Sequence, residues 1–192
     1  QPVWQVDLAA RDLDLTRLRE KALILGADNH TVRVVTDAVR GGRAPILNFS
    51  CAGPASSLNR LQAFTIRGEL AEALLHVPEV HLDLSAVSGP FAIAQGTLTG
   101  KDLKARLGNS SGYNGSILLD LTHEGDAFEL ALDLDADLSE LPGVLHQTVP
   151  EPDFLKEVDQ FTQIKGRAQG HLYVGDQLDD VRVEVEVKAV DA

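Results

Sequence analysis

The sequence has no methionine, one cysteine, one tryptophan and two tyrosines among its 192 residues. A single cysteine excludes an internal disulfide, and the apolar surroundings of Cys51 favour a buried structural thiol over a nucleophile. No apolar run approaches the roughly 20 residues that cross a bilayer, and no signal peptide is visible. Because the chain begins with Gln1 and lacks methionine, we expect it to be a fragment of a longer protein.

Positive charge is also scarce, since 17 lysines and arginines stand against 29 aspartates and glutamates and give a formal net charge of −12. This balance argues against a broad nucleic-acid surface, because phosphate binding needs clustered Lys and Arg. It would also repel an anionic membrane surface. With 44% hydrophobic and 24% charged residues, the composition is that of a globular domain.

Motifs that carry catalysis are missing as well. The six histidines show no metal-ligand spacing, and there is no nucleophile elbow. Asp133, Asp135 and Asp137 fall on one face of a strand, where calcium could bind, but their spacing follows the strand period and favours a solvated face. We therefore expect no enzyme, no metal site and no cofactor.

The sequence is rich in short segments in which apolar and polar residues alternate. In Val181–Val190, valines at alternate positions are separated by Arg182, Glu184, Glu186 and Lys188. Successive side chains of a strand point to opposite faces, so the pattern predicts one apolar face and one polar, solvent-exposed face. We expect this last strand to form a hairpin with Ile164–Val174, with its valines buried and its charges in water.

Other strands are expected at the chain start near Val3 and in seven further segments: Ile46–Ala52, Ala63–Leu70, Val80–Leu84, Phe91–Ala94, Leu98–Leu107, Ser116–Leu121 and Ala127–Asp135. Turn residues such as Ser88-Gly89-Pro90, Gly108-Asn109 and Asn114-Gly115 separate several of these strands. The connections are too short for parallel crossovers, which favours an antiparallel sheet.

Helical spacing predicts four helices. The first ends at Gly26, and the second begins after Asp28 and ends at Gly41-Gly42. Two short helices, Leu138–Leu145 and Asp153–Phe161, precede the hairpin. The expected fold class is mainly β (α+β): a curved antiparallel sheet or groove of about ten strands, in one domain with a helix-containing lobe (1–52) and a β-rich lobe (61–192).

The glycines and alternating apolar residues between Gly68 and Gly115 resemble the strand ladder of the AsmA-like family, which includes TamB. The segments that carry the resemblance are Gly68-Glu69-Leu70, Leu82-Asp83-Leu84, Gly96-Thr97-Leu98-Thr99-Gly100 and Leu103–Ser110. The segment Phe154–Gly170 is similar to the C-terminal AsmA repeat, and Leu178–Val181 is similar to the ending of that repeat. The resemblance covers most of the chain.

The resemblance implies a periplasmic, non-catalytic segment of a parent protein that is anchored in the inner membrane and serves outer-membrane biogenesis. It also implies an apolar groove that carries phospholipid between membranes. The implied partners are phospholipid acyl chains and neighbouring repeats of the parent chain, with no nucleic acid. The lining residues that we predict are Leu82, Leu84, Ile93, Leu98, Leu103, Ile117, Leu119, Leu121, Phe128, Leu130, Leu132 and Leu134.

The alternative is a closed β-sandwich that acts as a binding or scaffold module for carbohydrate or protein partners. A sugar site usually presents exposed aromatic rings, and here Trp4, Tyr113 and Tyr173 are scattered along the chain. Whether the apolar face is open or filled separates the two hypotheses.

Overall fold

The computed structural model describes residues 3–26, 30–54, 61–77, 82–122, 127–148, 152–159, 164–177 and 180–191. Their strands form one nine-stranded antiparallel sheet in which every strand pairs with the next one along the chain. The strands are β1 (Val3–Asp14), β2 (Val39–Pro54), β3 (Phe64–Val77), β4 (Leu82–Ala94), β5 (Thr97–Leu107), β6 (Ser110–Asp120), β7 (Ala127–Asp137), β8 (Arg167–Gln177) and β9 (Asp180–Asp191). The predicted mainly β, antiparallel fold is confirmed, as one open sheet and not as two packed sheets.

The sheet has nine strands where about ten were predicted, because two predicted strands join into β4. The predicted turn Ser88-Gly89-Pro90 is wrong, since Gly89 and Pro90 pair with Leu70 and Glu69 of β3. Asn114 and Gly115 likewise lie inside β6 and do not end it. Several turn types and the G1 type of β-bulge use positive φ, so glycine and asparagine are typical of either. The predicted turn at Gly108-Asn109 is found between β5 and β6.

The described residues also form the helices α1 (Leu15–Gly26), α2 (His30–Ala38), α3 (Leu141–Thr148) and α4 (Pro152–Val158), and the short 3-10 turns η1 (Leu61–Ala63) and η3 (Leu138–Glu140). The backbone N–H of Arg17 donates to Asp14 Oδ1 at 3.0 Å at the start of α1. The second predicted helix is too long, because Val39, Gly41 and Gly42 belong to β2. The predicted cap Asp28 and the predicted helix end Phe161 lie outside the described residues.

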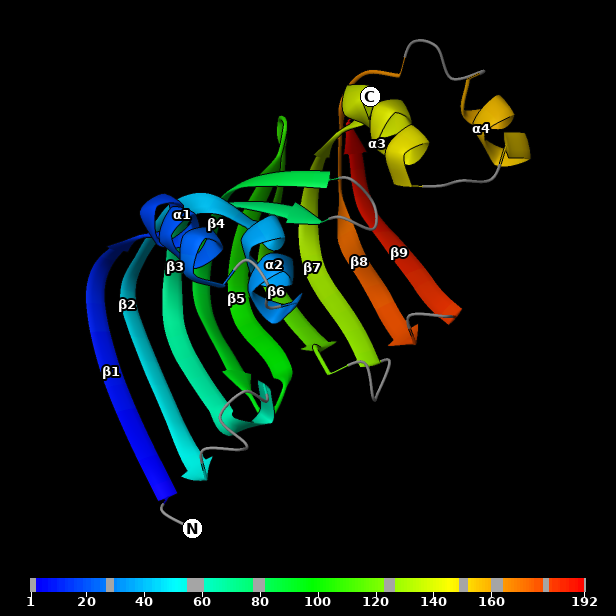
Figure 1. Cartoon of the computed structure of the whole chain (residues 1–192). Helices are drawn as coiled ribbons and strands as arrows, with labels where there is room; N and C mark the ends of the chain where they lie inside the picture. Colours follow the sequence, from blue (N-terminus) through cyan, green and yellow to red (C-terminus); the bar gives the residue numbers. More distant parts are fainter. Residues whose placement is uncertain are drawn as a thin grey trace.

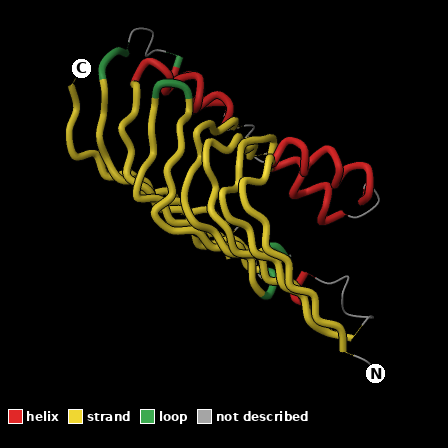
Figure 2. The backbone as a smooth tube through the Cα atoms, turned by 90° about the vertical axis from the view of Figure 1, so that its left-hand side faces the viewer, coloured by secondary structure: helices red, strands yellow, loops and turns green. Residues whose placement is uncertain are grey.

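The sheet curves, and α1 and α2 lie on its concave face over β2 and β3, whereas α3 and α4 lie beyond one end of β7–β9 (Figure 1). The side view in Figure 2 shows the strands bending together and the helices on one side of them. The main core cluster is small and lies under α1, where Leu15 packs with Ala44, Ala73 and Val87. Helix cover is thus concentrated at one end of the apolar face.

The boundary between the two predicted lobes lies near 53–60, of which 55–60 are outside the described residues. β2 and β3 flank this boundary and pair from Cys51 and Phe64 onward within the same sheet. Strands of both predicted lobes therefore share one sheet, and the division into lobes stays a prediction.

Candidate functional site

Apolar side chains form continuous rows across one face of the sheet. Residues directly opposite each other in an antiparallel pair share a face. One row joins Leu8, Phe49, Ile66, Ile93, Leu98, Leu119 and Phe128 on β1 to β7. A second row joins Ala10, Leu47, Gly68, Phe91, Gly100, Ile117, Leu130, Val174 and Val183 on β1 to β9. The second row alone spans all nine strands.

Along the strands, the apolar face continues past a line of positive-φ residues that crosses β1 to β6. Each of β1 to β6 contains a residue with positive φ in its interior: Asp12, Gly42, Glu72, Ala86, Asp102 and Asn114. An inserted residue shifts the side-chain period by one. In β3 the apolar face therefore passes from Ile66 and Leu70 to Ala73 and Leu75, and it stays on the same side of the sheet.

Eleven of the twelve predicted lining residues lie on strands of this apolar face, and Leu121 comes directly after the end of β6. Ile93, Leu98, Leu119 and Phe128 belong to the first row, and Ile117 and Leu130 to the second. By strand period, Leu132 and Leu134 continue the face along β7, Leu121 follows it from β6, and Leu82, Leu84 and Leu103 lie beyond the bulges. All twelve are half-buried. The described surface therefore brings them to one side of the sheet but leaves none of them fully enclosed.

Sequence reasoning missed part of this face, although the same alternation marks it. Leu47, Phe49 and Phe64 line its β2–β3 part, where the rings of Phe49 and Phe64 have centroids 5.6 Å apart. Sequence reasoning also missed the role of Gly100. A Cβ on Gly100 would lie 2.8 Å from the Leu103 side chain and 3.1 Å from Ile117, so the absent side chain lets these two residues meet.

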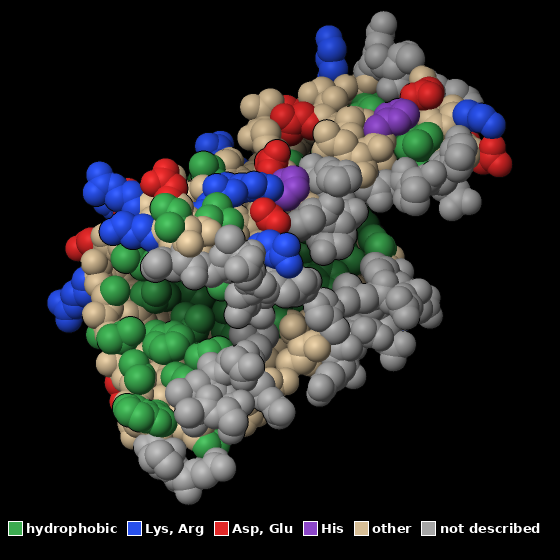
Figure 3. Space-filling view, in the orientation of Figure 1, with side chains coloured by type: hydrophobic (Ala, Val, Ile, Leu, Met, Phe, Trp, Pro, Cys, Tyr) green, Lys and Arg blue, Asp and Glu red, His purple; other side chains and the backbone are tan. Residues whose placement is uncertain are grey.

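The described part of the apolar face is hollowed. Figure 3 shows hydrophobic side chains gathered inside a depression beside the helical cover. Among the described residues, no large side chain is less than 2% exposed. Leu84 is the predicted lining residue that packs against the buried cluster, where α1 lies over the sheet. We name this apolar surface the trough: it is the face of β1 to β9 that carries the two rows and lies outside the cover of α1.

At both edges of the sheet the trough is strongly exposed. On β1, Trp4 and Leu8 are 57% and 62% exposed, and on β9 Val183 and Val185 are 59% and 61% exposed. The prediction that the valine face of the last strand is buried is therefore wrong. β9 is an edge strand, and no described element covers its valines. Arg182, Glu184, Glu186 and Lys188 are exposed, as predicted.

The opposite face of the sheet carries polar side chains that pair with each other. Asp133 accepts hydrogen bonds from Asn114 Nδ2 at 2.9 Å and from His171 Nδ1 at 3.0 Å, and Lys188 Nζ lies 3.9 Å away. The hydrogen bond from Asn114, followed by that from His171, lowers the pKa of Asp133 below its ordinary value of 3.8. One carboxylate thus links β6, β7, β8 and β9.

The neighbouring aspartates have separate partners. Asp135 Oδ1 accepts from Arg167 Nε at 2.6 Å, and Asp137 Oδ1 accepts from the backbone N–H of Ser139 at 3.0 Å. The hydrogen bonds of Ser139 lower the pKa of Asp137. No three His, Cys, Asp or Glu side chains of the described ranges gather as metal ligands. The three aspartates therefore form a row of separate polar contacts.

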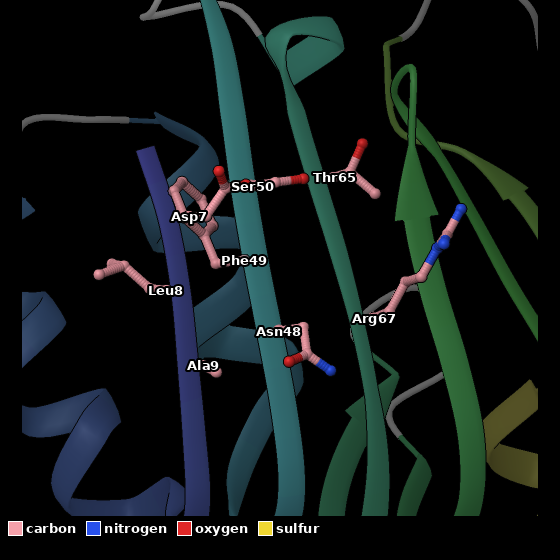
Figure 4. Close-up of a pocket in the computed structure, with 8 residues that line it drawn as sticks. All are labelled: Asp7, Leu8, Ala9, Asn48, Phe49, Ser50, Thr65 and Arg67. Carbon is pink, nitrogen blue, oxygen red and sulfur yellow. The ribbon is translucent and has the colours of Figure 1, made fainter. Parts of the chain in front are cut away.

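A shallow hollow of about 300 Å³ lies across β1, β2 and β3. In Figure 4 the helices lie behind these strands, so the view is onto the polar face. The side chains of Asp7, Asn48 and Arg67 around it are exposed. Cys51, the only cysteine, is buried on the other face and has no disulfide. These groups offer no pair of nucleophile and base within hydrogen-bonding distance.

Comparisons of the chain with protein-family models, curated proteins and solved structures found no match. Within the described ranges, no helix combines the length and apolar character needed to cross a membrane.

Proposed function

We propose that this chain is a non-catalytic segment of an AsmA-like periplasmic protein, in which the trough carries phospholipid acyl chains. The observation that supports this proposal best is the second apolar row, which continues from Ala10 to Val183 without a charged residue. The proposal includes the predicted setting: a parent protein anchored in the inner membrane, lipid transport between membranes, and outer-membrane biogenesis.

The physical chemistry of acyl chains fits such a surface. Each CH₂ group left in water costs about 0.8 kcal/mol, and an apolar surface removes that cost without specific polar contacts. The half-buried leucines and isoleucines of the trough would also lose exposed area on contact, worth about 25 cal/mol per Å². A uniform row of apolar side chains favours movement along it, because no position holds the chain by a strong directional bond.

The free edges fit a segment of a longer assembly. Among the described strands, β1 and β9 each pair on one side only. Long apolar edges of this kind are exposed to unwanted pairing unless something covers them. Under this proposal, strands of neighbouring repeats of the parent chain continue the sheet and the trough, as in other repeat architectures.

Leu119 and Leu118 provide a matched test. They are neighbours on β6 and both half-buried, but Leu119 lies in the trough and Leu118 on the opposite face. A photoreactive amino acid at position 119 should capture phospholipid from phosphatidylglycerol and phosphatidylethanolamine vesicles, and one at position 118 should not. Mass spectrometry of the adducts reads the result. Equal capture at the two positions, or capture of protein alone, would overturn the proposal. The same pair of positions can also be tested in the parent protein in cells.

A further inference from the structure

The two edges of the sheet are the least protected parts of the described structure. β1 and β9 are each 12 residues long and leave one side without a strand partner. Their apolar side chains are among the most exposed large hydrophobic residues. The charges of β9 lie on the polar face and do not shield its valines. Such edges favour addition of another strand.

The topology limits how two copies of this chain can join and keep the trough on one side. Eight antiparallel pairings separate β1 from β9, so these two strands run in the same direction. A copy placed beside β9 with its apolar face on the same side therefore presents β1 in parallel. We infer that β9 of one copy pairs in parallel with β1 of a second copy, so that the trough continues from copy to copy.

Charge on the polar face selects the register of this pairing. With Leu8 of the second copy beside Val183, Asp7 lies beside Arg182 and Arg11 lies beside Glu186. Both pairs have opposite charge. A shift of β1 by two residues toward the end of β9 puts Asp7 beside Glu184 and Arg11 beside Lys188, and both of those pairs repel.

The same register also matches the apolar face. Leu8 meets Val183 and Ala10 meets Val185, so apolar side chains adjoin across the junction. Arg182 already contacts Glu184 along its own strand and would lie between that carboxylate and Asp7 of the second copy. The ion pairs and the apolar contacts thus favour one arrangement.

Pairing of like edges fits less well. If two copies of β1 pair antiparallel with Asp7 opposite Arg11, Val6 meets Asp12 of the other copy. If two copies of β9 pair antiparallel around Glu184, that carboxylate meets itself. Joining unlike edges avoids the meeting of two identical carboxylates, and it places Asp12 beside Val187 at the end of the matched segment. This inference concerns the edges alone and does not rest on lipid transport: it states that a second copy takes these edges when the 192-residue chain is by itself in solution.

Charge-swap variants test the inference with the whole 192-residue chain. One variant carries Asp7→Arg and Arg11→Glu, and the other carries Arg182→Glu and Glu186→Arg. Both leave the net charge unchanged, and all four wild-type side chains are exposed. Sedimentation velocity over a concentration series at low salt should show association of the wild type. Each swap should weaken it by about tenfold or more.

Rescue is the decisive result. The chain with all four substitutions should associate like the wild type, and so should an equimolar mixture of the two swap variants. Pairing between two copies of β1 predicts otherwise, because a swapped β1 still complements itself. A monomeric wild type, or association that neither swap weakens, would overturn the inference. Lipid capture at Leu119 is read separately, so the two proposals can fail independently.

Cysteine trapping gives a second measurement that does not depend on charge. Ala9 lies beside Glu184 in the inferred register. Copies with Ala9→Cys mixed with copies with Glu184→Cys should form a mixed disulfide under mild oxidation, while the buried Cys51 stays reduced. Disulfides between two Ala9→Cys copies would instead indicate pairing of like edges and would overturn the inference.

Discussion

Val87 and Val183 occupy the same apolar face of the same sheet, but their surroundings differ completely. Val87 on β4 packs in the cluster under α1 and is 4% exposed, whereas Val183 on β9 is 59% exposed. Val183 comes from a segment of strict alternation, whereas Val87 is out of phase with Leu82 and Leu84 and reaches the same face through the shift at Ala86. The comparison teaches that alternation specifies which face a side chain takes, whereas burial depends on whether another element lies over that face.

The backbone of the two regions differs in the same way. The strands β1–β6 each contain a positive-φ residue, and several of their pairings shift register. β7 and β8 pair without a shift, and no residue of either strand has positive φ. Bulges bend a strand and increase its twist. The bulged region is the part that carries α1 and α2, whereas toward the open edge β7 and β8 pair regularly and the pairing of β8 with β9 shifts once, between Gln169 and Gly170.

The largest expected effect comes from placing one charge in each region. Val87→Asp should lower the free energy of unfolding by about 3 to 5 kcal/mol, because it buries an unpaired carboxylate. Val183→Asp should cost about 1 kcal/mol or less, since that side chain stays in water. Urea denaturation at low protein concentration measures both. Equal losses would mean that β9 is covered in solution and would remove the contrast between the regions.

A smaller effect is expected at Gly42, in the bulged part of β2. Its φ is +106°, and a Cβ there would lie 2.4 Å from the Cα of Ala73, which is itself fully buried. Gly42→Ala should therefore destabilise the protein by about 2 to 4 kcal/mol.

Gly143 supplies the matched control for that substitution. It lies in α3, where a Cβ on this residue would meet no described atom within 4 Å beyond the helix's own backbone. Gly143→Ala should stabilise the chain by up to about 1 kcal/mol through helix propensity. Thermal melts of both variants separate the backbone constraint in the sheet from the general effect of replacing glycine. A neutral Gly42→Ala would show that the bulge can relax.

The faces of the strands could be predicted from the sequence, because a period of two is local information. The start of β2 could not. Val32, Val35 and Val39 continue a helical spacing, but Val39 pairs with Leu75, and this contact is distant in sequence. Gly89-Pro90 could not be assigned either, since a bulge and a turn require similar backbone angles.

The candidate site could likewise be predicted only in part from the sequence. Within each segment, alternation places its leucine, isoleucine and phenylalanine positions on one face, but Leu82, Leu84 and Leu103 share that face with the others only through the period shifts at the bulges. The glycine at position 100 contributes through a close approach between strands, which only their register reveals. The openness of the trough depends on where the helices pack, and no local pattern encodes that.

A moderate effect is expected where η3, directly before α3, is tied to the turn between β5 and β6. The Glu140 carboxylate accepts hydrogen bonds from the backbone N–H of Asn109 at 2.8 Å and from Ser110 Oγ at 3.0 Å. Glu140→Gln should destabilise by about 1 kcal/mol, because it weakens two charge-assisted bonds. Glu184→Gln on the exposed face of β9 is the control and should be within about 0.5 kcal/mol of the wild type. Equal effects would mean that this tie is not formed in solution.

The smallest expected effect concerns pH and the carboxylate that links β6 to β9. Asn114 and His171 hold the pKa of Asp133 below its ordinary value of 3.8 in the folded chain. A depressed pKa means that the folded state favours the charged form. Its contribution to stability is therefore present above the unfolded value and is lost as pH falls through the folded pKa. Melting temperature should decline as pH falls from about 5 toward 3, as it does for paired carboxylates generally.

Asp133→Asn isolates the share of this group in that decline. The variant should melt lower than the wild type at pH 6, and the difference should shrink toward pH 3, where the wild-type carboxylate also becomes protonated. Glu129→Gln, on the same strand and the same face, removes an equal charge and serves as the control. A difference that stays constant with pH would show that Asp133 acts through packing and not through its charge. The polar link across β6 to β9 would then be ruled out as a source of acid sensitivity in the open half of the sheet.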